Sequence, residues 1–254
     1  MNTSSNKTAF ITGGSRGLGQ DAALQLAQKG YDIIFTYVQN AEGAASTQSA
    51  IEEMGSQAKA LQLDVRDVKS FPALKTNVET TLTEWGKSGL DYLVNNAGVG
   101  AHMTIGDGKE EIFDNLVNIQ FKGVYFLTDT LLPILNEGGA IVNISTGLTR
   151  FALPGYAAYA SMKGAIETYT KYLAKELGSK GIRANLVAPG AIHNDFNKAA
   201  FDHNPHIVDF IAQNTALGRV GQSDDIGSVV AFLCSDDAKW VNAQRIEASG
   251  GMFL

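Results

Sequence analysis

The feature that most restricts the fold is a regular alternation of short apolar segments with helical segments along almost the whole chain. Strands are expected at residues 8–12, 32–38, 58–63, 90–94, 181–187 and 244–248, with another beginning at 139, and helices at 20–29, 41–54, 67–85, 109–135, 157–178 and 224–233. Strands that alternate with helices pair in parallel, and the helices cover both faces of the sheet. The pattern therefore predicts an α/β fold, a doubly wound parallel sheet of about seven strands, with a ligand cleft at the C-terminal ends of the strands.

Composition limits the kinds of partner. The chain has 254 residues, of which 44% are hydrophobic and 18% charged, so residues 1–254 are expected to form a single globular domain. Its formal net charge is -6, whereas nucleic acids and anionic membranes bind basic surfaces. We therefore expect a small-molecule partner, no nucleic acid and no membrane.

Three absences bear on localisation. The lone Cys234 cannot form an internal disulfide, and the polar residues at 1–7 lack the apolar stretch of a secretory signal. No run of apolar residues approaches the roughly 18 that would span a membrane. The sequence thus predicts a soluble protein of the reducing cytoplasm.

A glycine-rich turn lies between the first expected strand and the first expected helix. It reads Thr12-Gly13-Gly14-Ser15-Arg16-Gly17-Leu18-Gly19. Glycines allow a positive φ and a close approach of the backbone to a ligand, and the free amides at a helix N-terminus favour an anion. The segment therefore predicts a site for the phosphates of a nucleotide, although such glycines also form ordinary turns.

The end of the second expected strand indicates which nucleotide binds. An acidic residue about 20 residues after the glycines would bind the ribose hydroxyls of NAD(H). Here the strand ends Thr36-Tyr37-Val38-Gln39-Asn40, without a carboxylate. Arg16 in the glycine turn can meet a 2′-phosphate, unless it is simply solvated. Tyr37 and Arg16 together favour NADP(H) over NAD(H).

Tyr159 and Lys163 lie four residues apart at the start of the helix expected at 157–178. This spacing puts both on one helical face, at the edge of its apolar stripe and facing a cleft. A nearby ammonium lowers the pKa of a phenol, which makes the phenol useful as an acid or base near neutral pH. Ser145 or Thr146, at the end of the preceding strand, could hydrogen-bond a substrate oxygen beside Tyr159. Alone, the pair is a weak signal, because this spacing is more often a tyrosine beside a solvated lysine.

Four motifs, in order along the chain, resemble those of the short-chain dehydrogenase/reductase family. They are Thr12-Gly13-x-x-x-Gly17-x-Gly19, Asn95-Asn96-Ala97-Gly98, Tyr159-x-x-x-Lys163 and Pro189-Gly190-Ala191-Ile192. The likeness covers almost the whole chain and is to the single-domain type, similar to β-ketoacyl carrier-protein reductases and related carbonyl reductases. It implies an oxidoreductase that interconverts a carbonyl and an alcohol with NADP(H), and a homotetramer in which helices 109–135 and 157–178 meet partner subunits.

The resemblance implies a role for each catalytic residue. Tyr159 is the general acid toward the carbonyl oxygen, and the base in the reverse direction. Lys163 holds the nicotinamide ribose and lowers the pKa of Tyr159, while Asn118 supports a water between Lys163 and solvent. Thr146 stands 13 residues before the tyrosine, where the family has serine. We prefer Thr146 to Ser145 because a shift of one residue along a strand turns the side chain to the other face.

The resemblance also implies the cofactor contacts. Asp64 and Val65 match the pair that meets the adenine, and Asn194 takes the place of a threonine beside the nicotinamide. The expected set is Gly13, Ser15, Arg16, Gly17, Leu18, Gly19, Tyr37, Asp64, Val65, Asn95, Ala97, Gly98, Tyr159, Lys163, Pro189, Gly190, Ile192 and Asn194.

Residues 191–215 are expected to form a substrate lid. Their aromatic, weakly polar composition suits a neutral or apolar carbonyl compound. His203 and His206 have no further ligands at a recognisable spacing, so no metal is expected.

Two alternatives remain open. A fold does not fix a function, so the chain could be a non-catalytic NADP(H)-binding sensor or interaction protein. Thr146 and Asn194, which depart from the residues of the family, favour this interpretation. It could also be a β-ketoacyl carrier-protein reductase, which should carry a basic docking patch near the cleft, with Arg150, Lys198 and Arg219 as candidates.

Overall fold

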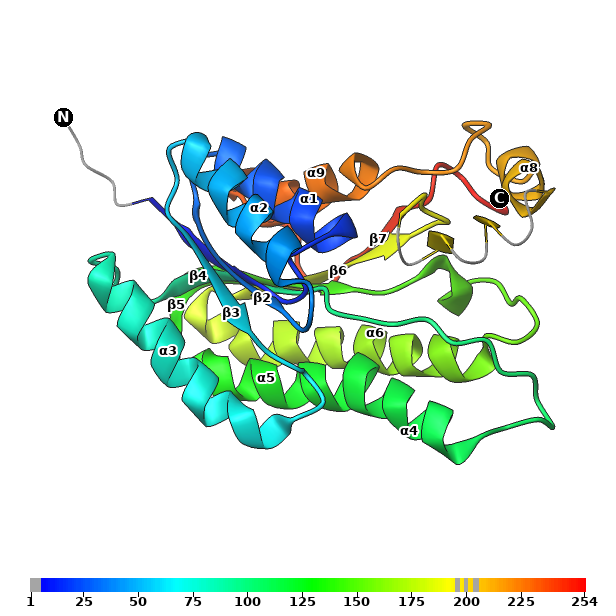
Figure 1. The fold of residues 1–254 in the computed structure, drawn as a ribbon, viewed down its shortest axis with the longest axis horizontal. Coiled ribbons are helices and arrows are strands. Elements are labelled where there is room, and N and C mark those ends of the chain that lie inside the picture. The colour runs from blue at the N-terminus through cyan, green and yellow to red at the C-terminus, as the bar shows by residue number, and fades with distance from the viewer. Residues whose placement is uncertain (1–5, 195–196, 199–200, 203–205) are drawn as a thin grey trace.

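The computed structural model describes residues 6–194, 197–198, 201–202 and 206–254 (Figure 1). Seven strands form one parallel sheet in the order β3-β2-β1-β4-β5-β6-β7. The strands are β1 (Thr8–Ile11), β2 (Asp32–Tyr37), β3 (Ala58–Gln62), β4 (Leu90–Asn95), β5 (Leu135–Ile144), β6 (Arg183–Pro189) and β7 (Arg245–Ala248). The predicted doubly wound α/β sheet is thereby confirmed.

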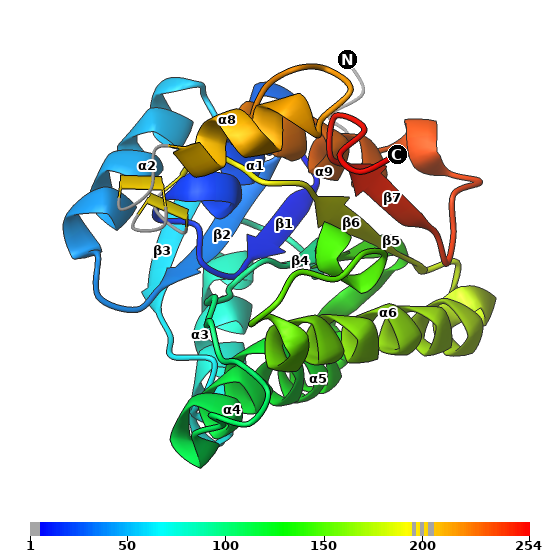
Figure 2. The ribbon, with the colours of Figure 1, turned by 90° about the vertical axis from the view of Figure 1, so that its right-hand side faces the viewer.

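Helices cover both faces of this sheet (Figure 2). One layer contains α1 (Gly17–Gln28), α2 (Ala41–Glu53) and α9 (Asp224–Leu233), and the other contains α3 (Phe71–Glu84), α4 (Glu110–Val117), α5 (Gly123–Leu131) and α6 (Ala157–Leu177). A further helix, α8 (His206–Gln213), lies beyond the first layer. Because both faces are covered, the strands are apolar along most of their length.

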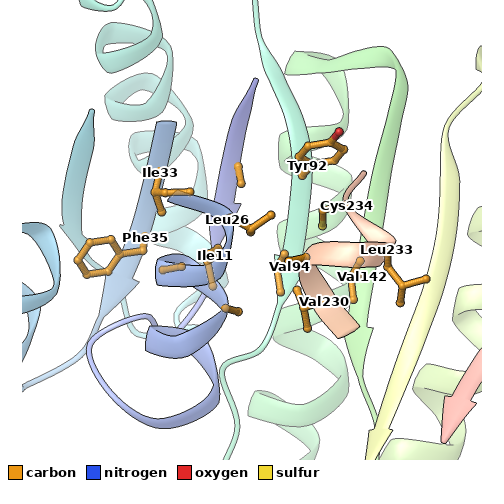
Figure 3. Packing of buried hydrophobic residues seen from close by; sticks show 14 of the residues in the cluster. Ile11, Leu26, Ile33, Phe35, Tyr92, Val94, Val142, Val230, Leu233 and Cys234 are labelled. Carbon is orange, nitrogen blue, oxygen red and sulfur yellow. The ribbon is translucent and has the colours of Figure 1, made fainter. Parts of the chain in front are cut away.

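The alternation of side chains along each strand divides the core into two parts. Ile11 faces the layer of α1 and α9, where it joins Leu26 and Val230 (Figure 3), whereas its neighbour Phe10 faces the layer of α3, α5 and α6. All of these residues are buried. Burial of both parts fixes the register of the strands, since a shift of one residue would exchange the two sets.

The helix expected at 109–135 is interrupted. After α4, a π-helical turn occupies Asn118–Lys122 and leads into α5, and β5 begins at Leu135, earlier than expected. Apolar periodicity does not reveal this turn, because the helical axis continues through it. Gly123 helps to explain its position: a Cβ there would lie 2.4 Å from the backbone carbonyl oxygen of Val65. Turns of this kind occur often at functional sites.

The order of the strands reverses between β1 and β4. Loops that leave neighbouring strands in opposite directions open a crevice at the C-terminal edge of the sheet. Here the loop after β1 carries the glycine turn, and the loop after β4 carries residues 96–98. None of the described helices combines the length and the apolar composition needed to cross a bilayer.

Candidate active site

Tyr159 and Lys163 occupy the first two turns of α6, and both are buried, with 8% and 5% of their surface exposed. Lys163 Nζ donates to the backbone carbonyl of Ile144 at 2.8 Å and lies 5.9 Å from the centre of the Tyr159 ring. A hydrogen bond joins the side chains of Thr146 and Tyr159. The end of β5 and the start of α6 thus bring together three of the four residues predicted to be catalytic.

The structure separates the two hydroxyl residues at the end of β5. Ser145 is buried, and its hydroxyl donates to Glu167 Oε1 at 2.7 Å. Thr146 has an extended backbone and precedes a 3₁₀ turn, where its Oγ1 accepts from the amide of Leu148 at 3.3 Å. Of these two hydroxyls, it is that of Thr146 that meets Tyr159.

Burial dominates the acidity of both groups on α6. It raises the pKa of the Tyr159 phenol above its ordinary value, and the hydrogen bond with Thr146 offsets only part of this rise. It also lowers the pKa of Lys163 to about 7. The predicted lowering of the Tyr159 pKa by Lys163 is therefore wrong for this structure, because burial has the largest effect on the phenol and raises its pKa.

The fourth predicted catalytic residue, Asn118, begins the π-helical turn, which packs against α6. Lys163 donates to Ile144, and no direct hydrogen bond joins it to Asn118 in the described part of the chain. The same turn carries the buried Gln120, whose amide donates to the backbone carbonyl of Val99 in the loop after β4. Sequence analysis did not identify Gln120, since an apolar pattern does not distinguish a buried amide from its neighbours.

The glycine turn after β1 forms a cradle almost free of side chains. Gly13 and Gly17 have φ values of +73° and +58°. A Cβ on Gly19 would lie 2.2 Å from the backbone carbonyl oxygen of Gly13, so only glycine lets α1 begin against the turn. Every residue of α1 is among those that the structure describes. Its first turn has no side-chain hydrogen bond that caps it and no acidic residue. These features fit the pyrophosphate of a dinucleotide, which the amides at the start of α1 would hold.

Hydrogen bonds lock this turn to the segment after β4. Thr12 Oγ1 accepts from the backbone amides of both Asn96 and Ala97 at 2.9 Å, and Asn96 Nδ2 donates to the Thr12 carbonyl at 2.8 Å. Asn95 points inward instead, and its amide donates to side chains of α5 and β5. Thr12 and Asn96, which belong to the quoted motifs, were not predicted as site residues, yet they join the two walls of the crevice.

The residues expected to contact the adenosine half lie at the C-terminal ends of β2 and β3. Arg16 is exposed at the N-cap of α1, and Tyr37, at the end of β2, is half-buried. Asp64 accepts hydrogen bonds from the Arg66 guanidinium, which hold the pKa of its carboxyl below the ordinary value. Val65 is buried beside it.

The residues expected beside the nicotinamide follow β6. Gly190 lies against Ser249, where an added Cβ would approach to 2.9 Å, and Ile192 is buried and pairs with Gly221. Asn194 faces the glycine turn, because a Cβ on Gly17 would lie 3.9 Å from its Nδ2. Pro189 ends β6, so these residues border the same crevice as the glycine turn.

An apolar cavity of about 350 Å³ adjoins the loop between Thr146 and Tyr159. Its lining consists of Ile105, Leu148, Ala152, Leu153, Pro154, Gly155, Tyr156, Ala157 and Ala160. The amide of Met103 donates to the Gly155 carbonyl at 2.7 Å and joins the loops on its two sides. A cavity of this size and character suits a small apolar ligand.

The three basic residues considered for a docking patch are each paired with an acidic residue. The ion pairs are Arg150–Glu247, Lys198–Asp202 and Arg219–Asp225. Each pair is neutral overall, so these three positions do not form an excess of positive charge.

The expected lid is described only in part. Phe196, His203 and Pro205 lie outside the described residues, while His206 begins α8. Within the described ranges, no group of three or more His, Cys, Asp and Glu side chains is placed to bind a metal.

Replacement of Lys163 by methionine should stabilise the protein in a pH-dependent way. The unfolded lysine titrates near 10.4 and the folded one near 7, so the folded state binds fewer protons between these values. The stability of the wild-type protein therefore rises with pH in this interval, and below about pH 7 the full cost of the buried charge is present. Lys163→Met should raise the free energy of unfolding by a few kcal/mol at pH 6, and by much less at pH 10.

Urea unfolding of the protein without added cofactor, at several pH values from 6 to 10, measures this difference. Lys171→Met, at an exposed position of α6, is the matched control and should show little change. A stability difference for Lys163→Met that stays constant across the pH range would contradict the prediction.

Comparisons with known proteins identify the family of the chain. A family model described as enoyl-(acyl carrier protein) reductase matches residues 13–253. A 3-oxoacyl-[acyl-carrier-protein] reductase of Staphylococcus aureus is 35% identical over 250 residues, which cover 98% of each chain. The fold resembles that of LugOII, a promiscuous reductase that catalyses keto-reduction at C1 during lugdunomycin biosynthesis, with a TM-score of 0.91 and 37% identity over 98% of both chains.

A second solved structure is similar to the same degree. The angucycline C-6 ketoreductase LanV with bound NADP gives a TM-score of 0.92 at 35% identity, over 97% of this chain and 95% of that one. The likeness extends over nearly the full chain in both sequence and fold. The protein belongs to the short-chain dehydrogenase/reductase family of oxidoreductases.

Proposed function

We propose that this protein is an NADP(H)-dependent reductase that converts a carbonyl group to a secondary alcohol. The observation that carries the proposal is the hydrogen bond between the Thr146 and Tyr159 side chains, with Lys163 one helical turn further along α6. A carbonyl oxygen beside these hydroxyls meets two donors at once. A non-catalytic sensor would account for the fold, but it would have no need of a buried, protonated phenol next to a buried lysine.

The side chains divide the chemistry as follows. When bound, NADPH would supply a hydride to the carbonyl carbon and become NADP+. Tyr159, kept protonated by burial, gives its proton to the oxygen as the electron pair of the C=O bond moves onto it, and Thr146 holds that oxygen in place. Lys163, with a pKa of about 7, can then return a proton to Tyr159, and Asn118 supports a water that links Lys163 to solvent.

The same residues serve the oxidation of an alcohol, with Tyr159 as the base. One C–H bond and one O–H bond form in the reduction, and both break in the reverse reaction. The cofactor residues named above would hold the dinucleotide, with the amides of the glycine turn available to its pyrophosphate.

The cavity lined by the loop between Thr146 and Tyr159 supports an apolar carbonyl substrate. Its walls offer alkyl groups and the ring of Tyr156. LugOII and LanV are both described as reducing ketones, which also supports a ketone. Reduction of a thioester-linked β-ketoacyl group on a carrier protein is less well supported, because Arg150, Lys198 and Arg219 are each paired with an acidic residue.

Tyr159→Phe should slow reduction greatly and spare cofactor binding. Loss of a general acid lowers kcat by roughly 10²–10⁴-fold, while the dissociation constant of NADPH, measured by fluorescence titration, should stay within about twofold. The assay is a panel of neutral ketones and one β-ketoacyl thioester with NADPH. Tyr31→Phe is the control, because Tyr31 is half-buried and directly precedes β2, at the N-terminal end of the strand. Wild-type rates in Tyr159→Phe would refute the acid role.

The choice of NADP(H) rests on the end of β2 and the start of α1. β2 ends at Tyr37 without a carboxylate, and the exposed Arg16 lies at the N-cap of α1. The start of α2 closes this corner, since a Cβ on Gly43 would lie 2.8 Å from the carbonyl oxygen of Ser15. A 2′-phosphate here would meet a guanidinium and no opposing carboxylate at the end of the strand.

We expect kcat/KM to be higher with NADPH than with NADH. Arg16→Ala should lower kcat/KM for NADPH by about tenfold, which is the effect expected when one hydrogen bond to a charged group is lost. Its kcat/KM for NADH should remain within about twofold of wild type, which provides an internal control. Equal losses with the two cofactors would show that Arg16 does not recognise the phosphate.

We also propose that the protein is a homotetramer with an interface on α5 and α6, two helices that lie side by side in Figures 1 and 2. Tyr125, Phe126 and Tyr172 are exposed on them by 42%, 41% and 62%. The Tyr125 ring also stacks on Tyr169, with a centroid distance of 4.8 Å. Exposed aromatic groups that gather on one face often mark an interaction site.

Light scattering should therefore give a mass near four times 27.0 kDa. The double replacement Tyr125→Glu/Tyr172→Glu should lower this mass, because two carboxylates would be buried at the interface. Met54→Glu, at an exposed position after α2, should leave it unchanged. A monomeric wild-type protein would refute the assembly.

A further inference from the structure

A charged cluster ties the loop that carries Thr146 to α6. Oε1 of Glu167 accepts hydrogen bonds from the hydroxyls of Ser145 and Thr149 and from Nε of Arg245, at 2.7, 2.6 and 2.8 Å. Burial of the Glu167 carboxyl opposes its ionisation, but these three donors outweigh that effect and hold its pKa below the ordinary value. Glu167 therefore acts as a charged anchor at neutral pH.

Arg245 extends the cluster from β7 to Thr146 itself. Its Nη2 donates to the backbone carbonyl of Thr146 at 3.0 Å and lies 3.1 Å from Thr149 Oγ1. Its Nη1 pairs with Glu247. Because a guanidinium presents its donors in one rigid plane, this side chain fixes the backbone of Thr146 relative to both α6 and β7.

One face of α6 contacts the end of β5 at three successive points. Tyr159, Lys163 and Glu167 follow one another at intervals of four residues, and they contact residues 146, 144 and 145 respectively. The first two belong to the reacting centre. Glu167 supports the same strand end one turn further from it.

We propose that Glu167 and Arg245 are positioning residues that hold the Thr146 hydroxyl in hydrogen-bond contact with Tyr159. This inference rests on the proposed reductase function. The two side chains are 21% and 25% exposed, and partly exposed ion pairs add little to global stability. Their loss should therefore disturb the placement of Thr146 more than the stability of the fold.

Steady-state reduction of the best ketone of the panel by NADPH tests the inference. Arg245→Met and Glu167→Gln should each lower kcat by roughly ten- to a hundredfold, the effect of a small misplacement of a catalytic group. KM for NADPH and the dissociation constant of NADPH should change by less than about twofold. Arg245→Lys should have a higher kcat than Arg245→Met, because the ammonium keeps the positive charge. Its kcat should stay below that of the wild type, because an ammonium reaches fewer acceptors than a guanidinium. The double variant should be no slower than Arg245→Met, since both residues act through one network.

Arg183→Met is the matched control. Arg183 is also half-buried and donates to the backbone carbonyl of Leu233, but it begins β6, at the end of the strand away from the crevice. The inference is overturned if Arg245→Met retains wild-type kcat, or if Arg183→Met loses as much. It is also overturned if Arg245→Met loses NADPH binding and thermal stability in parallel with kcat, which would indicate a purely structural role.

A crystal structure of Arg245→Met separates failure of this inference from failure of the proposed function. Thr146 Oγ1 should lie outside hydrogen-bond distance of the Tyr159 hydroxyl in the variant, whether or not any ketone is reduced. An unchanged Thr146 in the variant would overturn the positioning role. A wild-type protein that reduces no member of the panel would instead overturn the proposed function.

Discussion

The contact between the end of β5 and the start of α6 is the constraint on which the rest of the site depends. Strand and helix are joined there by the hydrogen bond from Lys163 to the Ile144 carbonyl and by that between Thr146 and Tyr159. This contact removes Tyr159 and Lys163 from water and so determines their acidity. A phenol that stays protonated and an amine that titrates near pH 7 are suited to the donation and return of a proton.

The sheet supplies the other half of the site. Because the strand order reverses between β1 and β4, the loops after these strands face each other across the crevice, and Thr12 and Asn96 bond them together. The π-helical turn at Asn118–Lys122 attaches the outer part of the second loop through Gln120. The crevice therefore has walls that are fixed on both sides, while the glycines leave room for a dinucleotide.

The cluster around Glu167 and Arg245 gives the site a link to the far edge of the sheet. β7 is the last strand, and it pairs only with β6 within the described sheet. Arg245 on this edge nevertheless bonds to the Thr146 loop and to α6. The loop that carries Thr146 is thus in contact with residues of α6 and β7, two elements that are distant from it in sequence.

The sequence by itself determined the order of strands and helices, the parallel sheet and the family, because apolar periodicity and glycine placement are local properties of the chain. It also gave the spacing that puts Tyr159 and Lys163 on one face, and Glu167 repeats that spacing, so the same signal could have revealed it. Only the tertiary structure decided that burial raises the pKa of Tyr159, that Ser145 binds Glu167 while Thr146 meets Tyr159, and that Arg245 and Gln120 hydrogen-bond the loops beside these residues. These outcomes depend on desolvation and on contacts between distant segments, neither of which follows from a local pattern.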